Sequence, residues 1–271
     1  MTTTQIALKA VVLDWAGTIV DHGSRAPVEA FREIFRRRDV TISHDEARGP
    51  MGLEKRDHIV SLLKMPRIAE SWRQVHGRNA AESDIDAMYD EFLPLQCDLL
   101  PQFADVIPGV LEALEVCRRR GLRIGSSSGY AAPLVETLSS LAESRGLTVD
   151  AVVSASEVAA GRPAPWMVFK NMETLDVYPP AAVAVVDDTA VGVEAGANAG
   201  VWSIGVVETG NLFGLTAAEL SRLSAGEREE RRAEGRTTLM AAGAHYVINS
   251  VADLPQTLDS ISERLALGER P

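Results

Sequence analysis

The sequence of 271 residues has only two cysteines, Cys97 and Cys117, and no apolar run long enough to cross a bilayer, which takes about 20 residues. Two cysteines do not make a disulfide framework, which favours a reducing compartment. The first residues also lack the apolar stretch and cleavage site of a secretory signal peptide. We therefore expect a cytoplasmic protein without a membrane partner.

Positive charge is also scarce in this chain. Lysine and arginine total 27 against 38 aspartates and glutamates, which gives a formal net charge of −11. This balance argues against nucleic acid or an anionic membrane surface as the main partner. A small anionic substrate stays possible, because a local cation overrides the global field. With 46% hydrophobic residues, the chain can form one large domain or two modest ones.

Short apolar runs of strand length alternate with amphipathic segments of helix length. The best runs are apolar throughout, which is typical of parallel strands covered on both faces. The segment 108–121 predicts a helix that stops at Gly121, and a strand follows at once. This order predicts an α/β protein with a Rossmann-like, doubly wound parallel sheet. The candidate strands are residues 10–15, 122–128, 150–156, 183–188, 201–207 and 245–250.

A stretch after the first predicted strand interrupts this rhythm and contains no convincing strand. Helically spaced apolar residues predict a helix over 26–38, and SHDE at 43–46 matches a capping box. Residues 82–93 have the pattern of a further amphipathic helix. We therefore expect an inserted α-helical cap, residues 24–100, and a catalytic core made of residues 1–23 and 101–271.

Acidic side chains stand at the ends of two predicted strands. Asp14 lies near the end of the first, and Asp187 and Asp188 end the run 183–188. Because the carboxyl ends of parallel strands meet at one edge of a sheet, we expect these carboxylates to share a site. A single aspartate at a strand end more often caps a helix or a turn, so the argument rests on the whole set.

Hydroxyl groups and one guanidinium complete that set. Ser126–Ser128 end the predicted strand 122–128, and Arg162 stands in a loop stiffened by Pro163. Carboxylates suit a hard divalent cation, whereas hydroxyl groups, backbone N–H groups and a guanidinium suit a phosphate. An aspartate can also attack phosphorus and form an acyl phosphate. The sequence thus predicts a site for phosphoryl transfer.

The order of Asp14, Ser128, Arg162 and Asp187–Asp188 resembles the four motifs of the haloacid dehalogenase superfamily, and the helical insert is similar to its cap domain. Members that cleave phosphate esters carry a second aspartate two residues after the nucleophile, where it protonates the leaving alkoxide. Here that position is Ala16, which cannot transfer a proton.

The stretch MGLEKRDHIV at 51–60 indicates another route. We expect Met51, Lys55 and His58 to lie along one face of a helix. A lysine amine can condense with an aldehyde to an imine, which withdraws electrons. A carbon–phosphorus bond needs such an electron sink and leaves no oxygen to protonate. Most helical lysines are solvated surface charges, but the combination with Ala16 favours catalysis.

Together, DWAGT, MGLEK, GRPAPW and MPRIAESW resemble segments of the phosphonoacetaldehyde hydrolase (phosphonatase) family. The resemblance implies a homodimeric hydrolase that cleaves the carbon–phosphorus bond of phosphonoacetaldehyde to give acetaldehyde and phosphate. It implies Asp14 as nucleophile, Lys55 as the imine-forming residue and His58 as a proton relay through water. It further implies Mg²⁺ held by Asp14, the carbonyl of Ala16 and Asp188, and substrate contacts from Met51, Ser128, Gly129, Tyr130 and Arg162.

One departure from that family concerns the acids. Some members have a Gly-Asp pair where this chain has Asp187–Asp188, and a further aspartate where it has Gly192. Asp187 or Glu194 could supply the second carboxylate, and the sequence leaves both open. Two other functions also stay open. One is a phosphomonoesterase of the same superfamily, against which Ala16 counts, and the other is a non-catalytic phosphate-binding regulatory protein.

Overall fold

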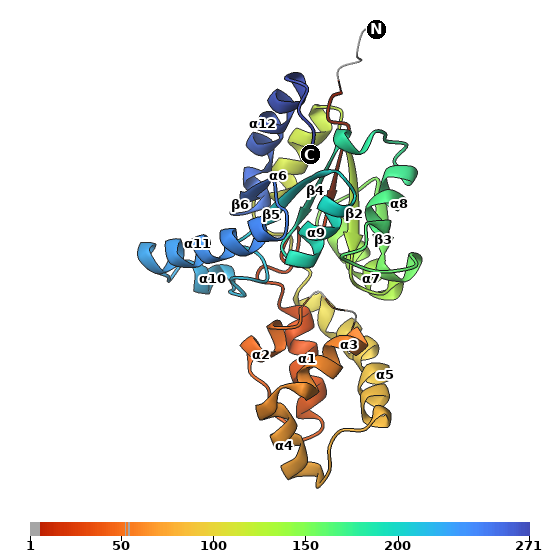
Figure 1. Cartoon of the computed structure of the whole chain (residues 1–271), viewed down its shortest axis with the longest axis vertical. Coiled ribbons are helices and arrows are strands. Elements are labelled where there is room, and N and C mark those ends of the chain that lie inside the picture. Colours follow the sequence, from red (N-terminus) through yellow and green to blue (C-terminus); the bar gives the residue numbers. More distant parts are fainter. Residues whose placement is uncertain (1–5, 52, 54) are drawn as a thin grey trace.

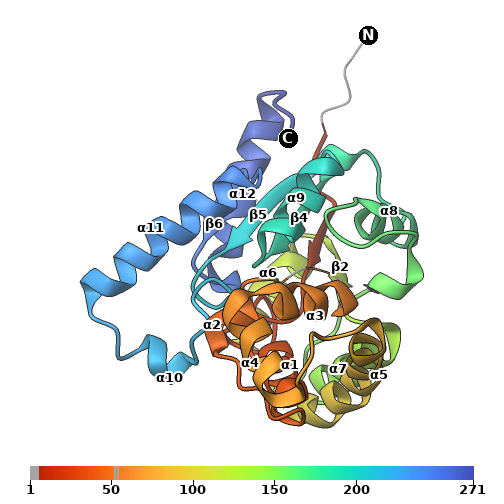
Figure 2. The ribbon, with the colours of Figure 1, turned by 60° about the horizontal axis from the view of Figure 1, so that its bottom comes forward.

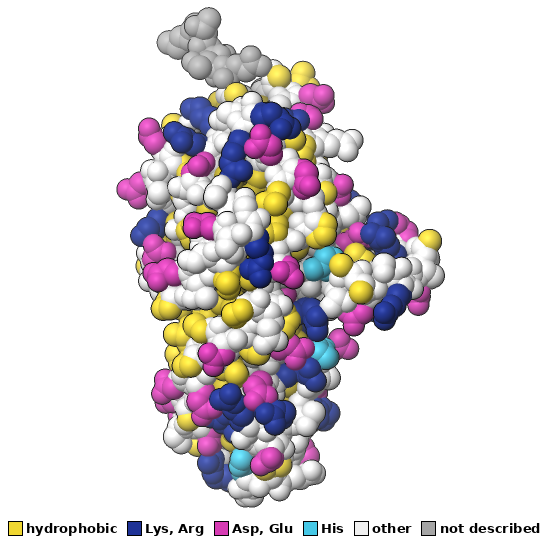
Figure 3. All heavy atoms as spheres, turned by 180° about the vertical axis from the view of Figure 1, so that it is seen from behind, with side chains coloured by type: hydrophobic (Ala, Val, Ile, Leu, Met, Phe, Trp, Pro, Cys, Tyr) yellow, Lys and Arg dark blue, Asp and Glu magenta, His cyan; other side chains and the backbone are white. Residues whose placement is uncertain are grey.

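The computed structural model describes residues 6–51, 53 and 55–271, so that Gly52 and Glu54 of the MGLEK stretch lie outside the described residues. Two bodies are joined end to end, with the sheet in the upper one and helices α1 to α5 in the lower (Figure 1). In the described ranges no helix combines the length and the apolar character needed to cross a bilayer. Acidic and basic side chains are interspersed over the rear face (Figure 3).

The upper body, the core, is built on a six-stranded parallel sheet with the order β3-β2-β1-β4-β5-β6. This confirms the predicted α/β class, and every predicted strand is present in slightly shorter form. The central pair is buried along its whole length because helices cover both faces. The strands are β1 (Ala10–Leu13), β2 (Arg123–Ser128), β3 (Ala151–Ser154), β4 (Val183–Asp187), β5 (Trp202–Val206) and β6 (Tyr246–Ile248).

Successive residues of β1 supply opposite faces of the sheet. Val11 and Leu13 belong to one apolar cluster, together with residues of α6, α7 and α12. Ala10 and Val12 belong to another, together with residues of α8. The core helices are α6 (Val110–Arg119), α7 (Ala132–Glu143), α8 (Trp166–Thr174), α9 (Ala190–Asn198), α10 (Ala217–Leu220), α11 (Ala225–Ala241) and α12 (Leu254–Ala266).

The lower body contains α1 (Ala26–Arg36), α2 (His44–Arg48), α3 (Lys55–Lys64), α4 (Pro66–His76) and α5 (Glu82–Leu99). These helices close around an apolar cluster of their own, in which Phe31, Ile59 and Trp72 are buried. The capping box is present, since Ser43 Oγ accepts from Glu46 N–H at 3.1 Å and the Glu46 carboxylate accepts from Ser43 N–H at 2.8 Å. Figure 2 shows this body turned towards the viewer.

One expectation for this region was wrong. Met51 was expected on a helix with Lys55 and His58, but it lies in a turn in which its N–H donates to Arg48 O at 2.9 Å. The helix predicted over 82–93 is confirmed, and it continues through Pro94 to Leu99. This extension is possible because a proline inside a helix removes one hydrogen bond without necessarily ending the helix.

The chain crosses twice between the two bodies, at residues 20–25 and 100–107, and these crossings lie side by side. Asp21 N–H donates to Asp105 O at 3.1 Å, and Val20 forms a bridge with Val106. The Asp21 carboxylate accepts from Ala26 N–H at 2.8 Å, which fixes the entry into α1. We propose that residues 24–100 form a separate cap domain, which the independent apolar cluster supports.

Candidate active site

Two neighbouring strands bring three carboxylates together at the carboxyl edge of the sheet. Asp14 follows β1, while Asp187 ends β4 and Asp188 comes next. The strands pair in register, and Asp14 N–H donates to Val186 O at 2.9 Å. Carboxylate oxygens of all three aspartates lie within 4.8 Å of one another, and all three side chains are buried.

One buried guanidinium lies among these acids. Arg162 Nη2 is 2.7 Å from Asp14 Oδ1 and 3.0 Å from Asp187 Oδ2, and it donates to Ser127 O at 3.1 Å. Only 9% of the arginine side chain is exposed, so both pairs are shielded from water. A single positive charge cannot balance three carboxylates, and the site has an excess of negative charge when all are ionised.

The raised pKa values of two of these aspartates agree with an excess of negative charge in a buried site. Burial raises the pKa of Asp14 to about 7, with Arg162 acting in the opposite direction and Asp187 adding to the rise. Burial and the charges of Asp14 and Asp187 also raise the pKa of Asp188 far above its ordinary value. A divalent cation would relieve this repulsion.

The two carboxylate oxygens of Asp188 also indicate a site for a cation. Its Oδ2 accepts from Asn211 N–H at 2.7 Å, whereas Oδ1 is buried without a hydrogen-bond partner among the described residues. An unpaired buried carboxylate oxygen is costly unless a cation occupies the space beside it. The donor set is therefore suited to a hard cation such as Mg²⁺.

The structure distinguishes the two candidates for the second carboxylate. Glu194 is exposed on α9 and lies outside the cluster, whereas Asp187 belongs to it. A Cβ atom at Gly192 would lie 2.0 Å from the carboxyl carbon of Asp187. The glycine thus leaves the space that the Asp187 side chain fills.

A cavity of about 400 Å³ opens above the acids, between the core and the cap. All predicted site residues except His58 and Asp187 line it, together with several residues that were not predicted. The cavity is lined by Asp14, Ala16, Ser24, Pro27, Met51, Leu53, Lys55, Asp57, Tyr89, Ser128, Gly129, Tyr130, Ala131, Ala155, Ser156, Gly161, Arg162, Asp188 and Thr189.

Lys55 extends from the cap towards the core side of this cavity. Its Nζ lies 5.6 Å from the ring centre of Tyr130, which follows β2, and 5.9 Å from the ring centre of Phe31 in α1. Both rings are close enough for cation–π attraction. The amine is therefore directed into the space shared with Asp14.

His58 occupies a different place from the one expected of a residue in contact with substrate. Its ring is fully buried and stacks on Phe31 with 3.7 Å between ring centres, and Nε2 donates to Ala47 O at 2.9 Å. Burial and, as a smaller cause, the charge of Lys55 lower the pKa of His58 to about 3. The imidazole is neutral, and its contacts hold α3 against α2.

Comparison with known proteins agrees with this geometry. The family model for haloacid dehalogenase-like hydrolases matches residues 8–200. A phosphonoacetaldehyde hydrolase of Paraburkholderia phytofirmans is 43% identical over 97% of this chain and 99% of its own length. One from Klebsiella pneumoniae is 44% identical over 97% and 99%. The chain belongs to the phosphonoacetaldehyde hydrolase family of haloacid dehalogenase-like hydrolases.

A solved structure of a phosphonoacetaldehyde hydrolase like protein from Oleispira antarctica extends this similarity to three dimensions. It superimposes with a TM-score of 0.95 at 38% identity and covers 100% of this chain and 99% of that one. A putative beta-phosphoglucomutase from Bacteroides vulgatus, at 22% identity and a TM-score of 0.64, shares the fold alone.

Several residues that line the cavity of this phosphonatase-family site were not predicted from the sequence. Ser24 is buried and adopts a left-handed φ of +49°, which is rare for a residue with a side chain. No sequence signal identifies it, because serine gives no sign of this conformation. Asp57 had a weak signal, since it stands in the first turn of α3 two residues after Lys55. The other missed residues include Pro27, Tyr89 and Ser156.

Proposed function

We propose that the protein hydrolyses phosphonoacetaldehyde to acetaldehyde and phosphate. The observation that carries the proposal is that Lys55 of the cap and Asp14 of the core line one cavity, with Ala16 at the place of the usual acid. The relatives of the same name, which match over nearly their whole length, support the substrate. An aldehyde and a phosphonate are the two groups that this pair of side chains can engage.

The first step takes place at the aldehyde. The Lys55 amine attacks the carbonyl carbon, water leaves, and a protonated imine (Schiff base) forms. Its positive nitrogen withdraws electrons from the neighbouring carbon–phosphorus bond. When that bond breaks, its electron pair enters an enamine, so no carbanion forms and no leaving oxygen requires a proton from residue 16.

Asp14 accepts the phosphoryl group in the same step. Its ionised carboxylate attacks phosphorus as the carbon–phosphorus bond breaks, which gives an aspartyl phosphate. Ser128, the backbone N–H of Gly129 and the guanidinium of Arg162 bind the phosphoryl oxygens. The enamine takes up a proton to return to an imine. Water then releases acetaldehyde from Lys55 and phosphate from Asp14, which restores both side chains.

Asp14, the carbonyl of Ala16 and Asp188 would hold Mg²⁺, and Asp187 would complete the acidic surroundings. When bound, the cation neutralises the repulsion between the attacking carboxylate and the phosphoryl oxygens. The Asp14–Arg162 contact orients the nucleophile and favours its ionised form, in opposition to the burial that raises its pKa. The contacts of His58 hold the helix that carries Lys55. The family resemblance also implies that His58 relays protons through water, and this role stays a prediction.

Borohydride reduction tests the imine directly. With wild-type protein and substrate, we expect a reduced two-carbon adduct on Lys55. With Asp14→Asn, which cannot accept the phosphoryl group, the adduct should retain phosphorus. Lys55→Arg should lower kcat by about 10³-fold or more, because arginine forms no such imine. Lys64→Arg, an exposed position on the same helix, is the matched control.

The result that would reject this mechanism is turnover of phosphonoacetaldehyde with Lys55 unmodified, or turnover that survives Lys55→Arg. Hydrolysis of sugar phosphates by the Lys55→Arg protein would favour the phosphomonoesterase instead. Absence of binding to both Mg²⁺ and phosphonates would favour a regulatory protein. The homodimer and the cytoplasmic location also stay predictions, and sedimentation velocity tests the first of them.

A further inference from the structure

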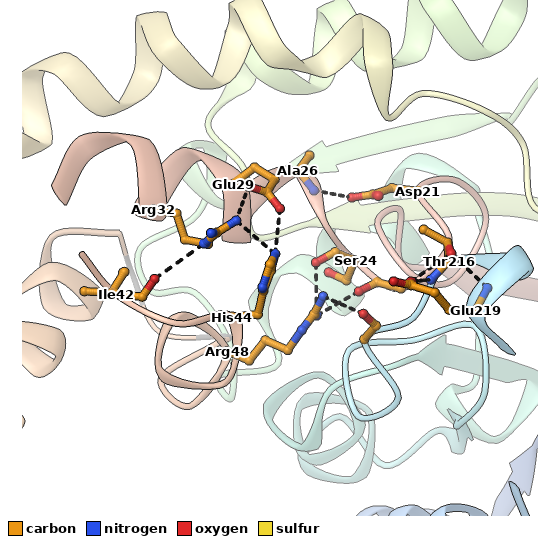
Figure 4. Close-up of polar contacts among 12 residues, drawn as sticks. Asp21, Ser24, Ala26, Glu29, Arg32, Ile42, His44, Arg48, Thr216 and Glu219 are labelled. Carbon is orange, nitrogen blue, oxygen red and sulfur yellow. Dashed lines mark hydrogen bonds and ion pairs between the residues drawn. The ribbon is translucent and has the colours of Figure 1, made fainter. Parts of the chain in front are cut away.

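Arg48, the last residue of α2 in the cap, reaches out of the cap and into the junction with the core. Its Nη1 donates to Gly23 O at 2.8 Å, to Ser24 O at 3.3 Å and to Asn211 Oδ1 at 3.2 Å. Its Nη2 donates to Gly214 O at 3.0 Å. Figure 4 shows the side chain extending towards Ser24 and the chain that leads to Thr216. One side chain thus joins the cap, the crossing segment and a core loop.

The acceptors of Arg48 are all uncharged. Within the part of the chain that the structure describes, no ion pair of Arg48 is found. Burial is the main cause that lowers its pKa, although the group stays a cation at neutral pH. A buried cation in such a place depends on its hydrogen bonds, and bonds from a charged donor to carbonyl oxygens are strong. Its planar fork presents donors to the crossing segment and to the core loop in a fixed geometry, which a lysine ammonium does not reproduce.

The loop of residues 209–214, which Arg48 contacts on the core side, also supports the acid cluster. Thr209 Oγ1 donates to Gly17 O at 2.9 Å, three residues after the nucleophile, and Thr209 O accepts from Gly23 N–H at 2.7 Å. Asn211, whose side chain binds Arg48, donates its N–H to Asp188. The loop is therefore held by the catalytic edge of the sheet and presents a fixed surface to the cap.

On the cap side, Arg48 is bonded to the segment that leads to Lys55. Its carbonyl oxygen accepts from Met51 N–H at 2.9 Å, and the neighbouring Ala47 O accepts from His58 Nε2. These two contacts tie the end of α2 to the turn before α3 and to α3 itself. A displacement of the Arg48 guanidinium would therefore move the helix on which Lys55 stands.

The core loop packs closely against the Arg48 side chain at Gly214. A Cβ atom at Gly214, which has a φ of +63°, would lie 2.4 Å from Arg48 Nε. Beside it, His22 of the crossing segment bonds to Leu215 O at 2.8 Å. The core loop therefore approaches the guanidinium as closely as a backbone without a side chain allows.

We propose that Arg48 is a positioning residue, which latches the cap onto the loop 209–214 and so sets Lys55 above Asp14. This inference rests on the proposed function, because it assigns Arg48 to the step in which Lys55 meets the substrate. The latch stabilises the closed arrangement and touches neither the substrate nor the acid cluster. Loss of this contact should therefore slow imine formation, whereas the affinity for the cation, which depends on the core, should not change.

The test compares Arg48→Met with Arg73→Met, an exposed cap arginine that bonds to Glu70 and Asn79. We expect Arg48→Met to lower kcat/KM, and the rate of borohydride capture at Lys55, by about 10- to 100-fold, the value of one or two strong hydrogen bonds. Its Mg²⁺ affinity, measured by calorimetry, should equal that of wild type. Arg48→Lys should recover only part of the loss, and Arg73→Met should behave as wild type.

Hydrogen exchange gives a measurement independent of turnover. Without the latch, amides in peptides covering 20–26 and 208–216 should exchange faster, among them Gly23 N–H. Wild-type exchange together with wild-type imine capture in Arg48→Met would overturn the proposal, and so would an equal loss of Mg²⁺ affinity and imine capture. If Arg48→Met does not fold, Arg48→Lys and Asn211→Ala carry the same test. A wild-type protein inactive on phosphonoacetaldehyde, but with faster exchange in Arg48→Met, would reject the proposed function while retaining the latch.

Discussion

Replacing Gly192 by alanine should destabilise the protein only while Asp187 keeps its carboxylate. An added Cβ would lie 2.0 Å from the Asp187 carboxyl carbon, whereas carbon atoms in contact are separated by about 3.5–4.0 Å. The carboxylate cannot easily move away. Its Oδ1 accepts from Thr189 N–H at 2.9 Å and from Thr189 Oγ1 at 2.7 Å, and its Oδ2 is paired with Arg162.

The size of the effect follows from opposing terms. Alanine is favoured over glycine inside a helix such as α9 by about 1 kcal/mol. Overpacking costs about 1–3 kcal/mol, and displacing the bonds of Asp187 costs about 1–3 kcal/mol more. Gly192→Ala should therefore lower the free energy of unfolding by about 1–5 kcal/mol. In an Asp187→Ala background the clash is absent, so the same change should raise it by about 1 kcal/mol.

Urea unfolding of the wild type, both single variants and the double variant, with EDTA present to remove bound cations, measures this coupling. We expect a coupling free energy of about 2–6 kcal/mol between the two positions. Additivity within about 0.5 kcal/mol would show that the space at Gly192 is not shared with Asp187, and the steric argument would then be refuted.

Three further predictions concern charge. Burial raises the pKa of Asp21 from 3.8 to about 7, so the folded state binds the Asp21 proton more tightly than the unfolded state does. The free energy of unfolding should therefore fall as pH rises from 4 to 7. Asp21→Asn should remove on the order of 4 kcal/mol of this fall in urea titrations. Mg²⁺ at about 100 times its Kd should stabilise the protein by about 2.7 kcal/mol in thermal unfolding, and Asp188→Asn should abolish this gain. Glu208→Gln, which leaves Arg228 and Arg232 of α11 without their buried partner, should cost about 1–3 kcal/mol in urea titrations, an amount reduced by the partial exposure of both arginines.

Much of the core could be predicted from the sequence because its determinants are local. Runs such as 10–15 and 183–188 are apolar up to their terminal acids, and this pattern is typical of strands covered on both faces. Parallel strands place their carboxyl ends at one edge, so the meeting of Asp14 with Asp187 and Asp188 followed from topology alone. The choice between Asp187 and Glu194 did not, because it depends on which side of α9 faces the site.

The junction could not be predicted, because its contacts join residues far apart in the chain. Arg48 bonds to backbone carbonyl groups and one amide, and any residue can offer a carbonyl, so its partners leave no pattern in the sequence. Met51 was misplaced for a related reason, since helical spacing was extended to a segment that forms a turn. The burial of His58 depends on Phe31, which lies on another helix.

The cap encloses an apolar interior that contains none of the residues buried beneath the sheet. Most of the apolar packing of each half therefore lies within that half, while Ala26, Leu93 and Cys97 of the lower body also pack against the core cluster. Met51, Leu53 and Tyr89 can therefore be exchanged to accept aldehydes of other shapes while the phosphorus-handling half stays as it is. Selection, natural or in the laboratory, can thus alter what is recognised without altering how phosphorus is transferred.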